Sequence, residues 1–278
     1  MKKIFFSVII PTLNEEKFLP HLLNNLVNQR DKDFEVIIVD ALSKDKTKKI
    51  ALDFKAKLNL RFFNHKGKNV SSQRNYGAKL AKGDYLIFLD ADSQIFSTFT
   101  KKLKKNILTK KGLVFIPQIL PDEKTTQTKL VFQFINLLVE LSQNLKKPFS
   151  AGGNLIFEKK LFHLIGGFDE KLFISEDHQI IQRAKNWGVT AKCLKEVKVK
   201  FSLRRFRKEG ELIVLYKYLI SLAYTLIKGD IKNKIFQYKM GGDQYEEKIN
   251  KDLFQEKLKQ TKRFFLKQIK SLKNFKFG

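Results

Sequence analysis

The sequence predicts an α/β fold in which a mostly parallel central sheet is flanked by helices. Short apolar runs alternate with segments of helical spacing from the amino terminus to Asp92. The runs are continuously apolar, as expected for parallel strands that helices cover on both faces. Strands that recur with helices between them indicate βαβ units.

The expected elements of this region follow one another in regular alternation. The expected strands are Phe5–Ile10, Phe34–Val39, Leu60–Phe63 and Tyr85–Leu89. The expected helices are Glu16–Gln29, Lys46–Phe54 and Ser71–Ala81. The apolar stretch after Lys3 is short and lacks the small-residue cleavage site of a signal peptide, so we interpret it as the first strand.

Polar and acidic residues follow these strands, and ligands of such sheets bind at the carboxyl ends of the strands. The strand ends read Pro11-Thr12-Leu13-Asn14-Glu15, Asp40-Ala41-Leu42-Ser43 and Asp90-Ala91-Asp92. No Gly-rich dinucleotide fingerprint follows the first strand, and the sequence contains no phosphate-binding P-loop. This argues against a Rossmann oxidoreductase and against a P-loop NTPase.

Asp90 and Asp92 end the apolar run Leu86–Leu89 with only Ala91 between them. An ionised carboxylate beside a core must be paired, hydrated or bound to a metal. Two carboxylates in this arrangement are well placed to hold a divalent cation through oxygen ligands. The alternative is that both acids cap the next turn, where Asp is common.

The chain is strongly basic, with 55 Lys+Arg against 28 Asp+Glu and a net charge of +27 over 278 residues. Such a charge favours nucleic acid, phosphorylated substrates or an anionic membrane face as partners, and a lysine-rich solvated surface is the alternative. Arginine, on which base reading relies, is scarce, so we expect no specific nucleic acid. The single cysteine, Cys193, allows no internal disulfide, which is typical of a reducing compartment.

Further motifs occur in a defined order along the chain. They are Gln73-Arg74-Asn75-Tyr76-Gly77-Ala78, Gly83-Asp84, Gly152-Gly153-Asn154, Gly166-Gly167-Phe168-Asp169 and Ser175-Glu176-Asp177. Together with the strand ends, their order and spacing resemble family 2 glycosyltransferases, which have the GT-A fold. The resemblance runs from about Ser7 to about Gly210. It implies a GT-A domain over residues 1–210, and we expect residues 211–278 to form a helical, basic extension.

The resemblance implies a site for a nucleotide-diphosphate sugar, with a UDP-sugar as the first expectation. The donor-binding residues that it implies are Pro11, Thr12, Asn14, Glu15, Asp40, Arg74, Asp90, Ala91 and Asp92. In the family, the acid that matches Asp40 hydrogen-bonds the base. The acid that matches Asp92 binds Mg²⁺ or Mn²⁺, and the one that matches Asp90 faces the ribose or the metal's water shell. Ala41-Leu42 departs from the family, which often has Asp or Gly there.

The resemblance also implies the residues on the acceptor side. Asp177 matches the general base that takes the proton of the acceptor hydroxyl. Gly152, Gly153, Asn154 and Glu176 match the loops near the acceptor and the donor sugar. Arg204 and Arg205 lie in a basic segment that can bind the diphosphate or form a solvated turn. The alternative for the acids of the expected helix Asp177–Asn186 is that they complement its dipole, with Ser175 as N-cap.

The implied activity is inverting, metal-assisted transfer of a sugar to a hydroxyl of a glycan or of a lipid-linked acceptor. A sugar-phosphate nucleotidylyltransferase of related fold is one alternative, although the usual Gly-rich loop is replaced by Thr12-Leu13-Asn14-Glu15. A non-catalytic basic protein that binds nucleic acid or lipid is another.

Outside the motifs, the sequence contains amphipathic and apolar segments. Lys129–Leu145 has a narrow polar stripe and a wide apolar face, which suits a buried helix or one at a membrane surface. Leu212–Ile227 is too short and too interrupted to span a bilayer. Lys257–Lys276 is basic and amphipathic, as in helices that bind anionic lipid. We therefore expect a cytoplasmic protein that can attach to the inner face of the membrane.

Overall fold

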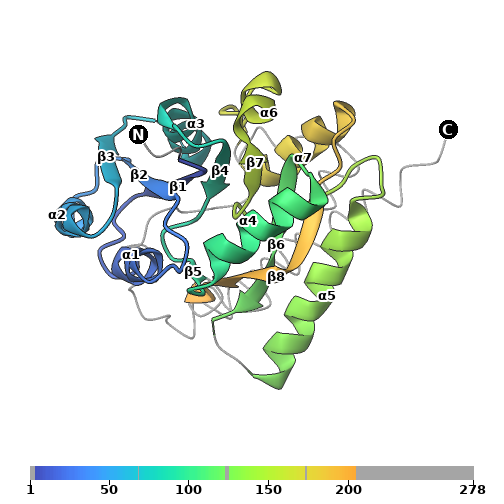
Figure 1. Cartoon of the computed structure of the whole chain (residues 1–278), viewed down its shortest axis with the longest axis horizontal. Helices are drawn as coiled ribbons and strands as arrows, with labels where there is room; N and C mark the ends of the chain where they lie inside the picture. Colours follow the sequence, from blue (N-terminus) through green and yellow to red (C-terminus); the bar gives the residue numbers. More distant parts are fainter. Residues whose placement is uncertain (1–3, 68, 123–124, 173, 205–278) are drawn as a thin grey trace, which may run out of the picture.

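The computed structural model describes residues 4–67, 69–122, 125–172 and 174–204. A central sheet runs through this part of the chain in the order β3-β2-β1-β4-β7-β6-β8-β5 (Figure 1). The strands are β1 Phe6–Thr12, β2 Phe34–Asp40, β3 Leu60–Asn64, β4 Tyr85–Phe88, β5 Gln94–Ile95, β6 Val114–Pro121, β7 Ile156–Glu158 and β8 Lys192–Phe201. The helices are α1 Leu19–Val27, α2 Thr47–Asp53, the short 3-10 helix η1 Phe54–Ala56, α3 Val70–Leu80, α4 Phe99–Lys110, α5 Thr126–Ser142, α6 Lys159–Leu164 and α7 Glu176–Asn186.

The first four strands form a parallel half, which confirms the predicted βαβ alternation. β1 lies between β2 and β4, β3 flanks β2, and all three pairings are parallel. Thr12 pairs with Asp40, so the carboxyl ends of β1 and β2 lie level. The β-branched residues of β2 fit the pleated sheet, and every residue of that strand is buried. Helix α1 begins at Leu19 rather than at Glu16, because Pro20 is tolerated only in a first helical turn.

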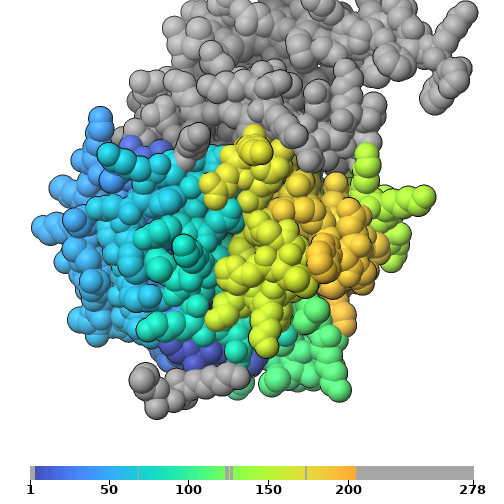
Figure 2. Space-filling model, turned by 90° about the horizontal axis from the view of Figure 1, so that it is seen from above, coloured from blue at the N-terminus to red at the C-terminus, as the bar shows by residue number. Residues whose placement is uncertain are grey.

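The other half of the sheet is mixed. β7 pairs antiparallel with both β4 and β6, while β6 and β8 are parallel. The register of β6 against β8 shifts between Pro117 and Gln118. Figure 2 shows the early segments (blue to cyan) beside the segments after α5 (yellow to orange) on one face of the molecule. The two halves of the sheet therefore meet at the β4–β7 pair.

Helices cover both faces of the sheet and create a core on each side. On one face, Val8, Ile10, Val36 and Ile38 pack with residues of α1 and α4 such as Leu22 and Leu103. On the other face, Ile9, Ile37 and Phe88 pack with Ala78 of α3, Phe162 of α6 and Ile180 of α7. Burial on both faces explains why these strands are continuously apolar.

Helix α5 lies at the outer edge of the molecule (Figure 1). Part of its polar stripe faces inward, because the Asn136 amide donates to Ile119 O at 2.8 Å and accepts from Ile119 N at 3.0 Å. Phe132 and Val139 are buried beside it, but most of the wide apolar face is exposed. The interpretation of this segment as a buried helix is therefore wrong.

Within the described residues, we find no helix with the length and apolarity needed to cross a bilayer. The segments Leu212–Ile227 and Lys257–Lys276 lie outside the described residues, as does Arg205. The predicted extension over residues 211–278 therefore stays a prediction.

Candidate active site

The ends of β1 and β2 hold Asp40 in a network of hydrogen bonds. Thr12 Oγ1 donates to Asp40 Oδ2 at 2.8 Å. Ser43 donates twice, from its backbone N to Oδ1 at 2.7 Å and from Oγ to Oδ2 at 2.5 Å. Asp40 is 2% exposed. A carboxylate has about four acceptor positions, so this fixed group can accept one further hydrogen bond, for example from a base N–H.

Two residues of the adjacent loops have left-handed backbone conformations. Asn14 has φ 52° and Leu42 has φ 62°. The Asn14 backbone N donates to Ser43 Oγ, and its side chain accepts from Lys44 N, both at 2.8 Å. These bonds tie the loop after β1 to the loop after β2. Asn tolerates this conformation better than Leu does, so Leu42 is the strained position.

Arg74, on α3, connects the acids after β4 with the start of α7. Its Nη2 lies 2.6 Å from Asp90 Oδ1, and its Nη1 lies 2.9 Å from Glu176 Oε1. The guanidinium also lies over the Phe168 ring, 5.3 Å from its centroid. Burial alone would lower the pKa of Arg74, but the two carboxylates raise it above its usual value. Arg74 therefore stays charged and holds Asp90, on the predicted donor side, and Glu176, on the predicted acceptor side, close together.

Burial and the ion pair with Arg74 shift the pKa of Glu176 in opposite directions. Desolvation raises the pKa of Glu176, the neighbouring Asp177 raises it further, and Arg74 opposes both. The Arg74 contact is thus the interaction that favours the charged form of this carboxyl.

Arg204 follows β8 and contacts two acids of the predicted donor site. Its two terminal nitrogens bind the two carboxylate oxygens of Glu15 at 2.8 and 2.9 Å. Its Nε lies 2.8 Å from Asp92 Oδ2, and its guanidinium lies over the Phe18 ring. Burial is the main cause that raises the pKa of Glu15 to about 7, while Arg204 opposes the shift and Asp92 and Asp90 add to it.

Asp177 lies at the start of α7 and is 7% exposed. Its Oδ2 accepts from Ser150 Oγ at 2.9 Å and from Gly152 N at 3.1 Å, and its Oδ1 accepts from His178 N at 2.9 Å. Ser175 occupies the N-cap position of α7, as the alternative interpretation expected, but it has φ 68° and forms no side-chain capping hydrogen bond. The carboxylate is held by the loop before β7 as well as by its own helix.

The loop that contains Gly153 and Asn154 packs directly on Arg74 and on the turn after β4. A Cβ on Gly153 would lie 1.9 Å from Arg74 Nη2, so only glycine leaves room for the guanidinium. Asn154 Oδ1 accepts from Asp90 N at 3.3 Å and from Ser93 Oγ at 3.0 Å. Its Nδ2 is a buried donor without a hydrogen-bond partner among the described residues.

The comparisons with known proteins agree with this geometry. The sequence model described as "Glycosyl transferase family 2" matches residues 7–166. The chain belongs to glycosyl transferase family 2. The match includes the predicted donor residues and the Gly152-Gly153-Asn154 loop. It favours a glycosyltransferase over the nucleotidylyltransferase and the non-catalytic alternatives.

Similar curated proteins are also glycosyltransferases. An uncharacterised glycosyltransferase of Rickettsia typhi is 29% identical over 189 residues, which cover 63% of this chain and 56% of the relative. The poly(ribitol-phosphate) β-N-acetylglucosaminyltransferase TarS of Staphylococcus aureus is 38% identical over 94 residues, 32% of this chain and 16% of TarS. The matched parts of this family 2 glycosyltransferase thus span little more than half of the first relative and a small part of the second.

Solved structures show the same GT-A fold. TarS residues 1–349 of S. aureus, in complex with UDP-GlcNAc, match with a TM-score of 0.59 at 24% identity, over 71% of this chain and 58% of that one. A mannosyltransferase of Pyrobaculum calidifontis, in complex with GDP-Man and Mn²⁺, matches with a TM-score of 0.62 at 18% identity, over 78% of this chain and 64% of that one.

Asp90 and Asp92 of this family 2 glycosyltransferase can provide part of a cation site that substrate phosphates complete. In the described part of the chain, no three His, Cys, Asp or Glu side chains are grouped so that they could hold a metal ion. Asp90 and Asp92 instead offer carboxylate oxygens at one turn. Mg²⁺ is usually bound by one or two carboxylates together with substrate phosphates, and Mn²⁺ also suits such oxygen ligands. The residues present therefore fit such an ion.

The structure brings most of the predicted residues together through direct contacts. Pro11 and Thr12 end β1, Ala91 is buried between the two acids, and Arg74 connects Asp90 to the residue before Asp177. One supporting residue, Ser150, escaped the sequence analysis, because it precedes the Gly152-Gly153-Asn154 motif in an ordinary loop. Phe168 belongs to a motif that the sequence analysis named, but its contact with Arg74 was not predicted.

Proposed function

We propose that the protein transfers a sugar from a nucleotide-diphosphate donor, with a UDP-sugar as the first candidate, to a hydroxyl of a glycan or lipid-linked acceptor. The observation that carries the proposal is the double contact of Arg74 with Asp90 and Glu176. This buried contact ties the predicted donor side to the residue next to the predicted base. The similar structure of TarS is a complex with UDP-GlcNAc, which supports a uridine nucleotide as the donor.

On the donor side, the fixed carboxylate of Asp40 accepts a hydrogen bond from the base. Asp92 would hold the divalent cation, with Asp90 as the second candidate ligand or the ribose partner. A bound Mg²⁺ or Mn²⁺ supplies Lewis-acid neutralisation of the charge on the departing diphosphate. Arg204 is close enough to Asp92 to share this task through bidentate phosphate binding.

On the acceptor side, Asp177 takes the proton of the acceptor hydroxyl. The acceptor oxygen then forms a bond to the anomeric carbon from the face opposite the diphosphate. The bond between that carbon and the diphosphate oxygen breaks, and the nucleoside diphosphate leaves with the electron pair. The configuration at the anomeric carbon is thereby inverted. The three hydrogen bonds to Asp177 hold its carboxylate in one orientation for this step.

Calorimetry with UDP in the presence and absence of Mn²⁺ tests the donor site. We expect metal-dependent binding of UDP, and the absence of any such binding would sink the proposal. Asp177→Asn should leave UDP binding intact and lower transfer by about 10²- to 10⁴-fold. Asp53→Asn, which changes an exposed acid of α2, is the matched control and should leave transfer unchanged. Full transfer by Asp177→Asn would show that another residue is the base.

The division into residues 1–210 and 211–278 is part of the same proposal. In it, the basic segment Lys257–Lys276 attaches the enzyme to the inner, anionic face of the membrane. Its support is the composition of that segment. Removal of residues 257–278 should weaken binding to anionic vesicles, and unchanged binding would remove this role.

A further inference from the structure

The exposed side of α5 and the loop after it carries a continuous row of large apolar side chains, which we call the α5 apolar face. It consists of Leu130, Val131, Phe134, Leu137, Leu138, Leu141 and Leu145. Leu130 and Phe134 are 61% and 60% exposed. Most of these residues are three, four or seven positions apart, so they share one side of a helix. Contiguous exposed apolar surface of this kind marks an interaction site.

The helix cannot rotate to bury this face without breaking specific contacts. Asn136 forms two hydrogen bonds with the backbone of Ile119 on the opposite side. Gln143 Nε2 donates to Phe149 O at 2.9 Å, and the Gln143 residue is 5% exposed. These buried polar groups would lose their partners on rotation. The α5 apolar face is therefore fixed in its outward orientation.

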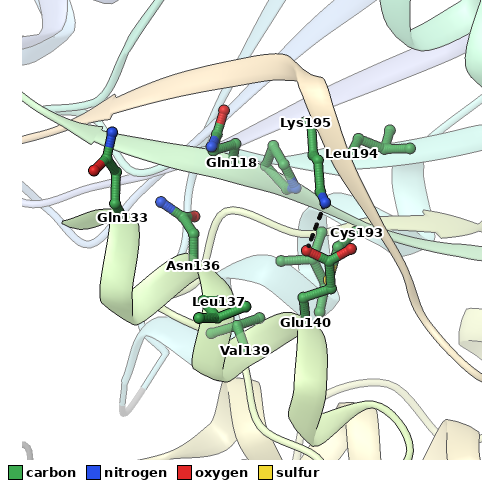
Figure 3. Close-up of a pocket in the computed structure, with 11 residues that line it drawn as sticks. Gln118, Gln133, Asn136, Leu137, Val139, Glu140, Cys193, Leu194 and Lys195 are labelled. Atoms are coloured by element: carbon green, nitrogen blue, oxygen red, sulfur yellow. Dashed lines mark ion pairs between the residues drawn. The ribbon is translucent and has the colours of Figure 1, made fainter. Parts of the chain in front are cut away.

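A hollow of about 260 Å³ lies on the flank of α5, against β6 and β8 (Figure 3). Glu140 and Lys195 form an ion pair across it at 3.1 Å, and Cys193 lines it with a thiol whose pKa burial raises to about 11. The hollow is smaller than the roughly 300–1,000 Å³ of ordinary ligand pockets, and its thiol is not activated. The outward face, rather than this hollow, is the candidate interaction site.

The charges around the α5 apolar face suit an anionic partner. Lys129 lies near its start, and Lys146 and Lys147 lie beyond its end, all three exposed. The acid within α5, Glu140, is on the flank and paired with Lys195. Lysines near an anionic membrane surface strengthen binding to it. A second copy of the chain is a poor partner, because two molecules of net charge +27 repel each other.

We propose that the α5 apolar face inserts into the headgroup region of an anionic lipid bilayer. The loop that follows α5 carries Ser150 and Gly152, which hold Asp177. Insertion would therefore bring the predicted base close to the membrane surface. The inference rests on the proposed function and sharpens it, since it assigns the acceptor hydroxyl to a lipid-borne molecule.

The position of the face at the membrane can be measured with a fluorescent residue in the full chain. The sequence has one tryptophan, which is the exposed Trp187. In the double variant Phe134→Trp with Trp187→Phe, the only tryptophan fluorescence comes from position 134. Vesicles of phosphatidylglycerol should shift its emission to the blue, and brominated acyl chains should quench it. Vesicles of phosphatidylcholine alone should have much less effect, because they lack the anionic charge.

Substitution within the face tests whether it contributes to binding. Leu137→Ser with Leu141→Ser should weaken affinity for phosphatidylglycerol vesicles by about tenfold or more, since both side chains lose apolar contact with lipid. Leu108→Ser with Leu164→Ser changes residues of α4 and α6 that are 61% and 60% exposed. This matched pair should bind vesicles like the unchanged protein.

Several outcomes would overturn the inference. Vesicle binding without any response at position 134 would place the contact elsewhere. A blue emission before lipid is added would mean that the chain itself or a second copy covers the face, and sedimentation would separate these two cases. Calorimetry with UDP and Mn²⁺ on the same samples keeps the two proposals apart. Normal nucleotide binding without a lipid response refutes only the membrane contact, whereas a lipid response without nucleotide binding refutes only the donor site.

Discussion

Arg204 Nε lies 2.8 Å from Asp92 Oδ2, so the carboxylate predicted to bind the metal already has a cationic partner. The same guanidinium binds both oxygens of Glu15. A divalent cation that binds Asp92 must therefore compete with Arg204 or share the carboxylate with it. A donor diphosphate gives the guanidinium an alternative anionic partner.

Replacement of Arg204 should affect binding of the metal and binding of the nucleotide in opposite directions. In Arg204→Gln, Mn²⁺ alone should bind about tenfold more tightly, because a charge-assisted contact to Asp92 is removed. UDP with Mn²⁺ should bind less tightly than in the unchanged protein, because a phosphate partner is lost. Both affinities can be measured by calorimetry. Arg30→Gln, an exposed change after α1, is the control, and the same response in that variant would contradict the prediction.

The ionisation of Glu15 should make stability depend on pH. Its pKa is raised from 4.5 to about 7 in the folded protein, so between these values the folded form binds the proton more tightly than the unfolded form. The contribution of this group to the free energy of unfolding is fully present below pH 4.5 and is lost as the pH rises through 7. The loss is about 3 kcal/mol.

Urea unfolding at pH 5 and pH 8 measures this effect. We expect Glu15→Gln to lose less stability between the two pH values than the unchanged protein does. Glu16→Gln, which changes the neighbouring acid, should keep the full pH dependence. Parallel curves for Glu15→Gln and the unchanged protein would show that Glu15 does not titrate in this range.

The close contact of Gly153 with Arg74 predicts a specific defect. In Gly153→Ala, the new Cβ displaces the guanidinium and weakens its bonds to Asp90 and Glu176. The free energy of unfolding should fall by roughly 1–3 kcal/mol, and binding of UDP with Mn²⁺ should weaken. Gly188→Ala has nothing within 4 Å of its Cβ but has φ +77°. It should lose stability through backbone strain alone and keep its nucleotide affinity.

The left-handed conformation of Leu42 predicts that glycine is better at this position. A left-handed residue other than glycine costs roughly 1–2 kcal/mol, whereas glycine adds about 0.5–1 kcal/mol of backbone entropy cost. The Leu42 side chain is 44% exposed, so its loss removes little packing. Leu42→Gly should therefore raise the free energy of unfolding by up to about 1 kcal/mol. Thermal unfolding checks this, and a lower melting temperature would contradict it.

The sequence predicted the parallel half of the fold well, because its signals are local. Continuous apolar runs define β1 to β4, and the acids after β2 and β4 lie at the same edge of the sheet because parallel strands end at one edge. The orientation of α5 could not be predicted in this way. Its apolar periodicity suited a buried helix and a helix at a membrane surface equally, whereas hydrogen bonds from Asn136 to β6, next to a register shift, determine which side faces inward.

The supporting contacts of the site were also beyond prediction. Glu15 and Arg204 are far apart in the chain, and no pattern of spacing pairs them. Ser150 is an ordinary loop residue until the fold brings it to Asp177. Such contacts depend on how distant segments pack, which the sequence of each segment does not specify.

The β4–β7 pair separates two sets of predicted site residues that come from different parts of the sequence. Asp40, Asp90 and Asp92 precede it, whereas Ser150, Gly153 and Asp177 belong to segments around and after β7. The strand contact itself is short: Tyr85–Ile87 pair with Ile156–Glu158, and Phe88 N donates to Leu155 O at 2.9 Å. Under the proposed function, an exchange of the later segments between homologues would change the acceptor while the residues predicted to bind the nucleotide are kept.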